Sequence, residues 1–292
     1  MTRSLSSETL ALRYHTFRWG QQTYLMGVLN VTPDSFSDGG QFNSLESALN
    51  QAQKMVTSGA DILDIGGQST RPNADEVTLD EELDRVIPVI QTLRQHPEFS
   101  QVPISVDTTR SQVAKAAISA GADLINDISG ATFDAEMLST VAKLGVPIVL
   151  MHTRGTPKTM QTLTDYEDLI GEILQFLAAR IQAAIAAGID RRQIIIDPGI
   201  GFAKKTAQNL EILRQLPAFR SLGCPILVGV SRKSFIGHIL NQPDPQTRVL
   251  GTAAACVSAI VGGTDILRVH DVAEMHDACR VADAIWRPCP IN

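Results

Sequence analysis

The sequence predicts an α/β fold, a single-domain (β/α)8 or TIM barrel, on three observations. Apolar, strand-like runs recur about eight times along the 292 residues. Each run is followed by a segment with apolar residues at helical spacing, and no linker or low-complexity tract interrupts the alternation. Parallel strands covered by helices read as nearly continuous apolar runs, and eight such units close a barrel. An open, doubly wound sheet is the alternative.

Strand and helix candidates alternate in order along the chain. The predicted strands are Tyr24–Val31, Ile62–Gly67, Pro103–Thr108, Leu124–Ser129, Pro147–His152, Ile194–Gly199, Pro225–Ser231 and Ile266–His270. The predicted helices are Leu45–Ser58, Asp80–Gln95, Ser111–Ala120, Ala135–Leu144, Asp168–Ala187, Ala207–Gln215, Gln246–Val261 and Val272–Trp286. Glycines that are expected to end helices stand at Gly59, Gly121, Gly145, Gly188 and Gly262.

A short extension precedes the predicted barrel. Residues 1–23 contain one strand-like stretch, Tyr14–Trp19, and residues 24–292 are assigned to the barrel. Because no linker separates further units, the alternation favours one domain over two.

Composition excludes several classes of protein. The net charge of −6 has the wrong sign for binding nucleic-acid phosphates, so no nucleic-acid partner is expected. The four cysteines have no metal-site spacing and are expected to be reduced, buried thiols. Met1–Gly20 has no apolar segment long enough for a signal peptide, and no segment is expected to span a membrane. The expected compartment is the cytoplasm.

Polar residues recur near the carboxyl ends of the apolar strands. They are Asn30, Asp64, Asp107, Asn126, Asp127, His152, Asp197, Ser231, Arg268 and His270. In a barrel these strand ends meet on one face, where the following loops build the active site. A single polar residue at a strand end is ordinary, but recurrence on nearly every strand predicts one pocket ringed by these side chains.

The first two strand-following loops have the composition of ligand-binding loops. Residues 27–40 form a long segment rich in Gly, Pro, Ser and Asp, and Asn30 at its rigid start offers an amide oxygen for Mg²⁺ together with substrate phosphates. The second loop pairs Gly66 and Gly67 and presents Arg71, whose guanidinium suits phosphate or carboxylate. A mobile surface loop and a solvated arginine are the plainer alternatives.

Asp197 ends a buried apolar strand and needs hydrogen-bond donors there. A pterin or guanine ring supplies two adjacent N–H groups that match the two oxygens of a carboxylate. A structural salt bridge to a neighbouring Lys or Arg is the alternative.

Basic residues follow the seventh and eighth strands, at 231–234 and 268–271, where barrels often bind phosphate. Because the chain as a whole is acidic, this local reversal of charge favours a small anionic ligand. Motifs for a nucleophilic serine, a zinc protease, a Walker loop or a dinucleotide-binding loop are missing from the sequence. The site is therefore expected to act by positioning and by stabilising a departing anion.

Several of these segments together resemble the dihydropteroate synthases of the pterin-binding enzyme family. The matching segments are MGVLNVTPDSFSDGG from Met26, GGQSTRP from Gly66, SVDT from Ser105, NDISG from Asn126, HTRGTPKTMQ from His152, DPGIGF from Asp197, GVSRKSF from Gly229 and RVHD from Arg268. The resemblance runs from about residue 24 to the end. Gln68 and Thr153 depart from the usual family wording, and neither carries a role here.

The resemblance implies a transferase of folate biosynthesis and a target of sulfonamides. It would join 6-hydroxymethyl-7,8-dihydropterin diphosphate to 4-aminobenzoate, with Mg²⁺ as cofactor. It implies that the pterin is held by Asp107, Asn126, Asp197 and Lys233. The diphosphate would be bound by Arg71, Arg268 and His270, and by Asn30 through Mg²⁺. The 4-aminobenzoate pocket would be lined by Phe36, Ser69, Thr70, Pro72 and Ser234.

The resemblance also implies a dissociative reaction, in which diphosphate leaves and the arylamine captures a pterin-methyl cation. This agrees with the residue types, because an arylamine is neutral at pH 7 and the leaving group needs cations such as Lys233 and Arg268, with His270 beside them. Asp107 would offset the transient positive charge.

Two other functions remain open. A pterin-dependent methyltransferase shares the barrel and pterin-binding residues but needs no diphosphate site, and the basic residues disfavour it. A barrel that binds pterin without catalysing a reaction should lack some of these charged residues, and none of them is missing from this sequence. The helices Gln246–Gly263 and Val272–Trp286 are candidates for a homodimer face, although packing on the barrel explains them equally well.

Overall fold

Eight parallel strands form a closed barrel in the computed structural model, which describes residues 9–31, 41–69 and 76–287. They are β3 (Tyr24–Asn30), β4 (Ile62–Gly66), β5 (Ile104–Asp107), β6 (Leu124–Asp127), β7 (Ile148–Met151), β8 (Ile194–Asp197), β9 (Leu227–Val228) and β10 (Ile266–Val269). Hydrogen bonds order them β8-β7-β6-β5-β4-β3-β10-β9, and a parallel bridge from Ile196 to Ile226 closes the ring. The predicted barrel is confirmed, and the open sheet is excluded.

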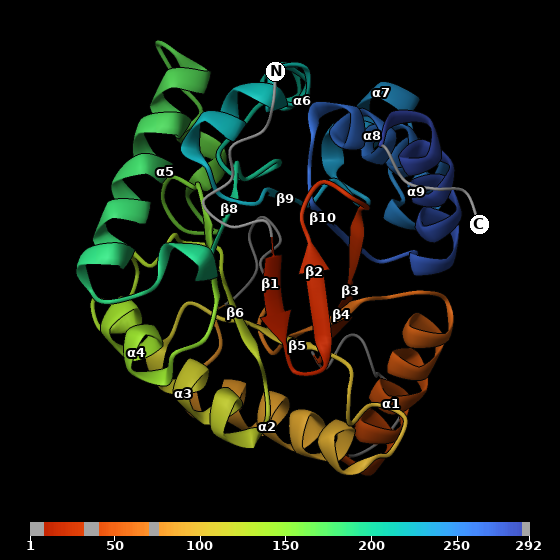
Figure 1. The fold of residues 1–292 in the computed structure, drawn as a ribbon. Helices are drawn as coiled ribbons and strands as arrows, with labels where there is room; N and C mark the ends of the chain where they lie inside the picture. The colour runs from red at the N-terminus through yellow and green to blue at the C-terminus, as the bar shows by residue number, and fades with distance from the viewer. Residues whose placement is uncertain (1–8, 32–40, 70–75, 288–292) are drawn as a thin grey trace.

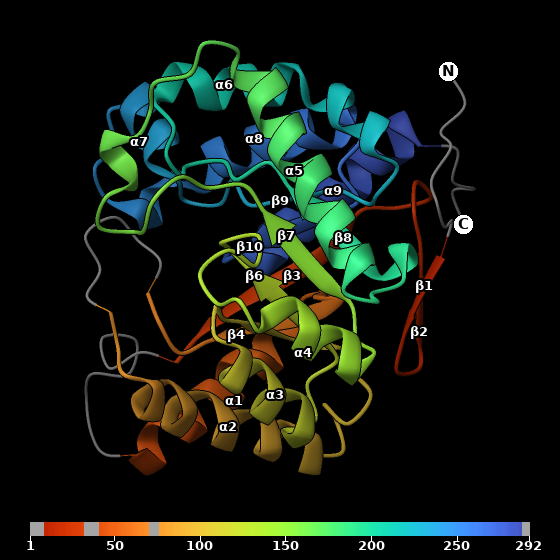
Figure 2. The same cartoon turned by 90° about the vertical axis from the view of Figure 1, so that its left-hand side faces the viewer.

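Helices surround the barrel on the outside, as Figures 1 and 2 show. The α-helices are α1 (Gln41–Thr57), α2 (Leu79–Gln95), α3 (Ser111–Ala120), α4 (Met137–Leu144), α5 (Leu169–Ala186), α6 (Thr206–Arg214), α7 (Ser234–Leu240), α8 (Val249–Gly262) and α9 (Val272–Trp286). Short 3₁₀ segments lie at Met160–Thr162, Arg191–Gln193, Leu216–Leu222 and Pro245–Arg248. All eight predicted helices are present, and α7 is an addition that the sequence pattern did not predict.

One predicted helix end is wrong. Gly262 is the last residue of α8, and the left-handed cap is Gly263, with φ +94°. A Cβ on Gly262 would lie 2.8 Å from the Leu216 side chain, so this glycine serves close packing. The other four predicted glycines all have positive φ.

The barrel interior is apolar at its amino end. Alternate residues of each strand point inward, and the first inward layer includes Met26, Ile62, Leu124, Val149 and Ile195. A second, larger core lies between the strands and the surrounding helices.

An N-terminal hairpin covers this end of the barrel. Strands β1 (Thr9–Leu12) and β2 (His15–Arg18) pair antiparallel and lie across the barrel in Figure 1. The Phe17, Trp19 and Tyr24 rings lie with centroids 4.6–5.9 Å apart, and they join the inner apolar layer. Phe17 and Trp19 are stacked, and both meet Tyr24 edge to face. The strand predicted over 14–19 is thus one arm of the hairpin, and its partner β1 was not predicted.

Two further sequence predictions concern α5 and the cysteines. Among the described helices, α5 alone is long and apolar enough to cross a membrane by composition. In this fold it buries Ile173, Leu177 and Ile181 in the core between the helices and the barrel. Cys224, Cys256 and Cys279 are buried free thiols, as predicted, and Cys289 lies outside the described residues.

Candidate active site

A cavity of about 390 Å³ opens at the carboxyl end of the barrel. Two residues along from the apolar layer, the next inward positions are polar: Asp64 follows Ile62, Asn126 follows Leu124, and Asp197 follows Ile195. The site residues that line the cavity are Asn30, Ser69, Asn126, Asp197, Ser231, Lys233, Ser234, Arg268 and His270. The predicted convergence therefore holds for six of the ten strand-end residues: Asn30, Asn126, Asp197, Ser231, Arg268 and His270. Asp64 lies beneath the cavity, Asp107 lines a neighbouring one, and Asp127 and His152 line neither.

Asp197 offers a carboxylate oxygen to a ligand. Its side chain is buried, and Oδ1 accepts a hydrogen bond from the Gly199 N–H at 2.7 Å. No Lys or Arg among the described residues comes within ion-pair distance of this carboxylate, so a structural salt bridge, the alternative reading, is not formed here. Burial raises the pKa of Asp197 to about 6, against the lowering effects of the Gly199 hydrogen bond and of Lys233.

Arg268 joins two buried carboxylates from neighbouring strands. Its Nε donates to Asp64 Oδ2 at 2.6 Å and its Nη2 donates to Asp107 Oδ2 at 2.7 Å. Asp64 and Asp107 raise the pKa of Arg268 despite its burial, so the guanidinium stays charged. Nε and Nη2 of Arg268 thus bind carboxylates of the protein, and Nη1 is available to an anion.

Asn126 is oriented by the same carboxylate. Its Nδ2 donates to Asp64 Oδ2 at 3.1 Å, which directs the amide oxygen elsewhere. Asp64 is completely buried, and its Oδ1 has no hydrogen-bond partner among the described residues. Asp64 therefore acts beneath the cavity as the residue that holds both Asn126 and Arg268.

Asp107 lines a second, smaller cavity of about 90 Å³ beside the first. Ile128 borders both cavities, so they are neighbours. Burial raises the pKa of Asp107 to about 7, and nearby Asp64 and Glu82 add to the rise while Arg268 opposes it. Arg268 therefore only partly offsets the cost of a negative charge on Asp107.

Lys233 places its ammonium 4.2 Å from the centre of the Phe202 ring. Gly201, with φ +84°, makes room for it, because a Cβ there would lie 2.9 Å from Lys233 Cδ. Burial and Arg268 lower the pKa of Lys233 to about 8, while Asp197 and Asp107 oppose the shift. The lysine is therefore held between a ring face and the carboxylates.

His270 is neutral and hydrogen-bonded to Ser231. Its backbone N–H donates to Ser231 Oγ at 3.1 Å, and its ring Nδ1 lies 3.0 Å from the same oxygen. Burial, Arg268 and Arg232 lower the pKa of His270 to about 3. This contact leaves Nε2 of the neutral ring for a ligand.

Asn30 is the predicted metal ligand. It ends β3, is partly buried and lines the main cavity. Within residues 9–31, 41–69 and 76–287, no group of His, Cys, Asp and Glu has the arrangement of a metal site. A lone amide oxygen fits Mg²⁺ only as an ion that brings most of its ligands as phosphate oxygens and water.

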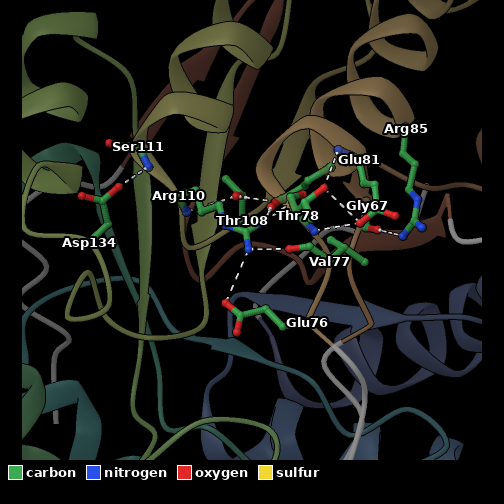
Figure 3. A network of polar contacts seen from close by, with 11 residues as sticks. Gly67, Glu76, Val77, Thr78, Glu81, Arg85, Thr108, Arg110, Ser111 and Asp134 are labelled. Atoms are coloured by element: carbon green, nitrogen blue, oxygen red, sulfur yellow. Dashed lines mark hydrogen bonds and ion pairs between the residues drawn. The ribbon is translucent and has the colours of Figure 1, made fainter.

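The loop after β4 is anchored at both of its described ends (Figure 3). Arg85 Nη1 donates to the Gly67 carbonyl at 2.9 Å, and Arg110 Nη2 donates to the Val77 carbonyl at 2.6 Å. Arg110 also pairs with buried Glu82, which accepts from Thr108 as well. Thr70, Arg71 and Pro72, predicted for this loop, lie outside the described residues, as does Phe36 in the first loop.

The sequence reasoning gave no role to Phe202 or Lys204, and it placed Asp64 at the pocket without assigning its function. Lys204 is buried, and its ammonium lies 3.0 Å from His152 Nδ1 and donates to the Phe202 carbonyl at 2.8 Å. Burial lowers the pKa of Lys204 to about 7 and that of His152 to about 2, so the imidazole is a neutral acceptor. The sequence pattern that indicates such a role for Asp64 is a carboxylate in the middle of an otherwise apolar strand.

Comparisons with known proteins agree with this geometry. The family model described as "Pterin binding enzyme" matches residues 26–270. The chain is 61% identical over 271 residues to the dihydropteroate synthase of Synechocystis sp., covering 93% of each chain. It is also similar to two solved structures, each covered to 98%. The Yersinia pestis dihydropteroate synthase with a sulfonamide drug is 44% identical over 95% of this chain, with TM-score 0.88. The Xanthomonas albilineans dihydropteroate synthase with 7,8-dihydropteroate is 41% identical over 95%, with TM-score 0.84.

The chain belongs to the pterin-binding enzyme family. Within that family its function is that of the dihydropteroate synthases, transferases of folate biosynthesis.

Proposed function

We propose that the cavity binds 6-hydroxymethyl-7,8-dihydropterin diphosphate and 4-aminobenzoate and joins them into 7,8-dihydropteroate and diphosphate. One observation carries the proposal. A buried carboxylate with a free oxygen, Asp197, shares a cavity with the basic side chains Lys233 and Arg268. A ligand that is polar and uncharged at one end and anionic at the other fits this arrangement.

The pterin end of the substrate is assigned to the acidic side of the cavity. Asp197 accepts the two adjacent N–H groups of the aminopyrimidinone, and Asn126, held by Asp64, adds a hydrogen bond. Lys233 and Asp107 complete the predicted pterin-binding set. Each bond offsets part of the desolvation of the buried carboxylates.

The diphosphate end is assigned to Arg268 and His270, with Arg71 from the second loop. Mg²⁺ at Asn30 would neutralise the departing diphosphate when it is bound. Arg268 is pre-oriented by Asp64 and Asp107, so little rearrangement is needed when negative charge develops on the leaving group.

The reaction is proposed to be dissociative. The bond from the pterin methylene to the diphosphate oxygen breaks, and its electron pair leaves with the diphosphate. The pterin-methyl cation that forms lies near the Asp107 carboxylate. The neutral nitrogen of 4-aminobenzoate then forms the new C–N bond and releases a proton to solvent or to diphosphate. The proposed arylamine pocket consists of Phe36, Ser69, Thr70, Pro72 and Ser234, of which Ser69 and Ser234 line the described cavity.

Diphosphate release tests the proposed reaction. Purified protein with the pterin diphosphate and Mg²⁺ should release diphosphate when 4-aminobenzoate is added and form one dihydropteroate per diphosphate. Bare 6-hydroxymethyl-7,8-dihydropterin serves as the control that cannot react. Release that does not depend on the arylamine, or methyl transfer in its place, contradicts the proposal.

Chelation tests the Mg²⁺ assignment. If Asn30 organises metal and diphosphate, removing Mg²⁺ should weaken binding of the pterin diphosphate by at least about tenfold and leave the bare pterin unaffected. Calorimetry with and without chelator measures both affinities. Equal effects on the two ligands contradict the assignment.

We further propose a cytoplasmic homodimer. The neighbouring helices α8 and α9 expose several large apolar side chains, and Leu250 is 84% and Ile285 65% exposed. Such side chains favour burial against a second copy. Sedimentation velocity should give a dimer for the native protein and a monomer for Leu250→Glu combined with Ile285→Glu. A native monomer at micromolar concentration contradicts the proposal.

A further inference from the structure

The loops that follow β9 and β10 are joined side by side at the basic end of the cavity. Ser231 and Arg232 bond to His270 and Asp271, so two consecutive residues of one loop meet two consecutive residues of the other. Ser231 Oγ accepts a hydrogen bond from the His270 backbone N–H and contacts the His270 ring at Nδ1. Arg232 Nε donates to Asp271 Oδ2 at 3.0 Å, and Arg232 Nη2 bonds Asp271 Oδ1.

Arg232 is held in a backbone conformation that side chains disfavour. Its φ is +58°, in the left-handed region. Its N–H donates to Thr252 Oγ1 at 3.1 Å, and its carbonyl accepts from Arg248 Nη1 at 2.8 Å. These contacts, together with the paired guanidinium, fix a conformation that the isolated chain would rarely adopt.

The left-handed backbone of Arg232 sets the direction in which the chain enters Lys233. Lys233 follows Arg232 directly and is the N-cap of α7, with its ammonium over Phe202. On the other loop, His270 directly precedes Asp271. The Arg232–Asp271 pair is thus one residue away from two predicted ligand-binding side chains.

The charge of Arg232 is already used within the protein. Its side chain is 27% exposed and that of Asp271 is 11% exposed, so the pair is only partly screened by water. The hydrogen bonds to Asp271 raise the pKa of Arg232 above its ordinary value. Arg232 lines the main cavity, but its Nε and Nη2 are committed to Asp271.

We infer that Arg232 and Asp271 are positioning residues whose ion pair sets the spacing of Lys233 and His270 for the anionic end of the substrate. The inference rests on the proposed function, because it takes the diphosphate to lie at this end of the cavity.

Asp271→Asn tests the inference. The substitution keeps the shape but turns one acceptor into an NH₂ group that faces the guanidinium. Affinity for the pterin diphosphate should fall by about tenfold or more, while affinity for bare 6-hydroxymethylpterin stays within about twofold. Arg232→Lys, which keeps the charge but loses the fork, should show the same split. Calorimetry measures both affinities for each variant.

Asp283→Asn is the matched control. Asp283 is also 11% exposed in its side chain and paired with an arginine, Arg287, but this pair bonds Thr23 at the start of β3, at the other end of the barrel. This variant should lower the melting temperature and leave both affinities unchanged.

Three results separate the possible failures. Unchanged affinity for the pterin diphosphate in both site variants overturns the inference. Equal loss of affinity for the bare pterin overturns it too, because that marks a general structural role. If the native protein itself prefers the bare pterin to its diphosphate, the proposed function fails before the variants are compared.

Discussion

The two ends of the barrel use buried carboxylates in opposite ways. At the amino end, Asp283 accepts hydrogen bonds from the Thr23 N–H at 2.6 Å and from Thr23 Oγ1 at 2.8 Å, and its carboxylate forms an ion pair with Arg287. Asp123 there pairs with both Arg13 and Arg94. At the carboxyl end, the Asp197 carboxylate accepts one hydrogen bond from the described residues, donated by the Gly199 N–H.

The difference separates stability from function. A buried acid whose oxygens are all bonded holds the fold together, whereas an acid with a spare oxygen costs stability until a ligand supplies the missing donors. The raised pKa of Asp197 is consistent with this cost. The incompletely bonded carboxylate of Asp197, which faces the cavity, therefore marks the binding end of this barrel.

The largest expected effect is on ligand binding at the carboxyl end. Asp197→Ala should weaken binding of the pterin diphosphate about 1,000-fold, or about 4 kcal/mol, because two buried N–H groups of the ligand lose their acceptor. Calorimetry measures the affinity, and circular dichroism checks the fold. If the variant binds the pterin diphosphate with native affinity, the proposed difference between the two ends of the barrel is wrong.

The converse substitution at the amino end should affect stability alone. Asp123→Ala leaves Arg13 and Arg94 without their partner and should lower the free energy of unfolding by about 3 kcal/mol. Urea unfolding measures this loss. The KM values for both substrates should be unchanged, and a clear rise in either KM would show that the amino end also shapes the site.

Stability at the carboxyl end should depend on pH in an unusual direction. Because the folded pKa of Asp197 is about 6, above the ordinary 3.8, the folded state binds the proton more tightly than the unfolded state. This contribution is lost as pH rises from about 4 to 6. Asp197→Asn should therefore be more stable than the native protein at pH 8, by about 1–3 kcal/mol.

Thermal unfolding across this pH range measures the difference. The advantage of the Asn variant should disappear below about pH 4, where the native carboxyl is protonated in both states. An advantage that is independent of pH would mean that packing, and not ionisation, explains it.

The smallest effects come from a pair of glycines. Gly201 and Gly145 both have positive φ, so alanine at either should cost about 1 kcal/mol of stability. A Cβ on Gly145 meets nothing within 4 Å, whereas one on Gly201 meets Lys233. Steady-state kinetics should show kcat/KM falling about tenfold for Gly201→Ala and unchanged for Gly145→Ala. Equal kinetics would show that Lys233 has room to adjust.

Local sequence patterns predicted much of this fold. The ends of α3 and α9 were predicted to the residue, because each has helical spacing of apolar residues and a clear boundary. The polar strand ends located the cavity, since chain direction alone brings the carboxyl ends of parallel strands together. Single residues at close contacts were harder, as the displaced cap at Gly263 shows.

The sequence by itself determined the alternation of strands and helices and the end of the barrel at which the chemistry lies, because both follow from periodicity and chain direction. Only the tertiary structure decided the pairing among the buried charges. Arg268 bonds Asp64 across 204 residues of sequence, and Lys204 reaches His152 across 52. No local pattern specifies such partners, because they depend on which inward positions share a layer once the barrel has closed.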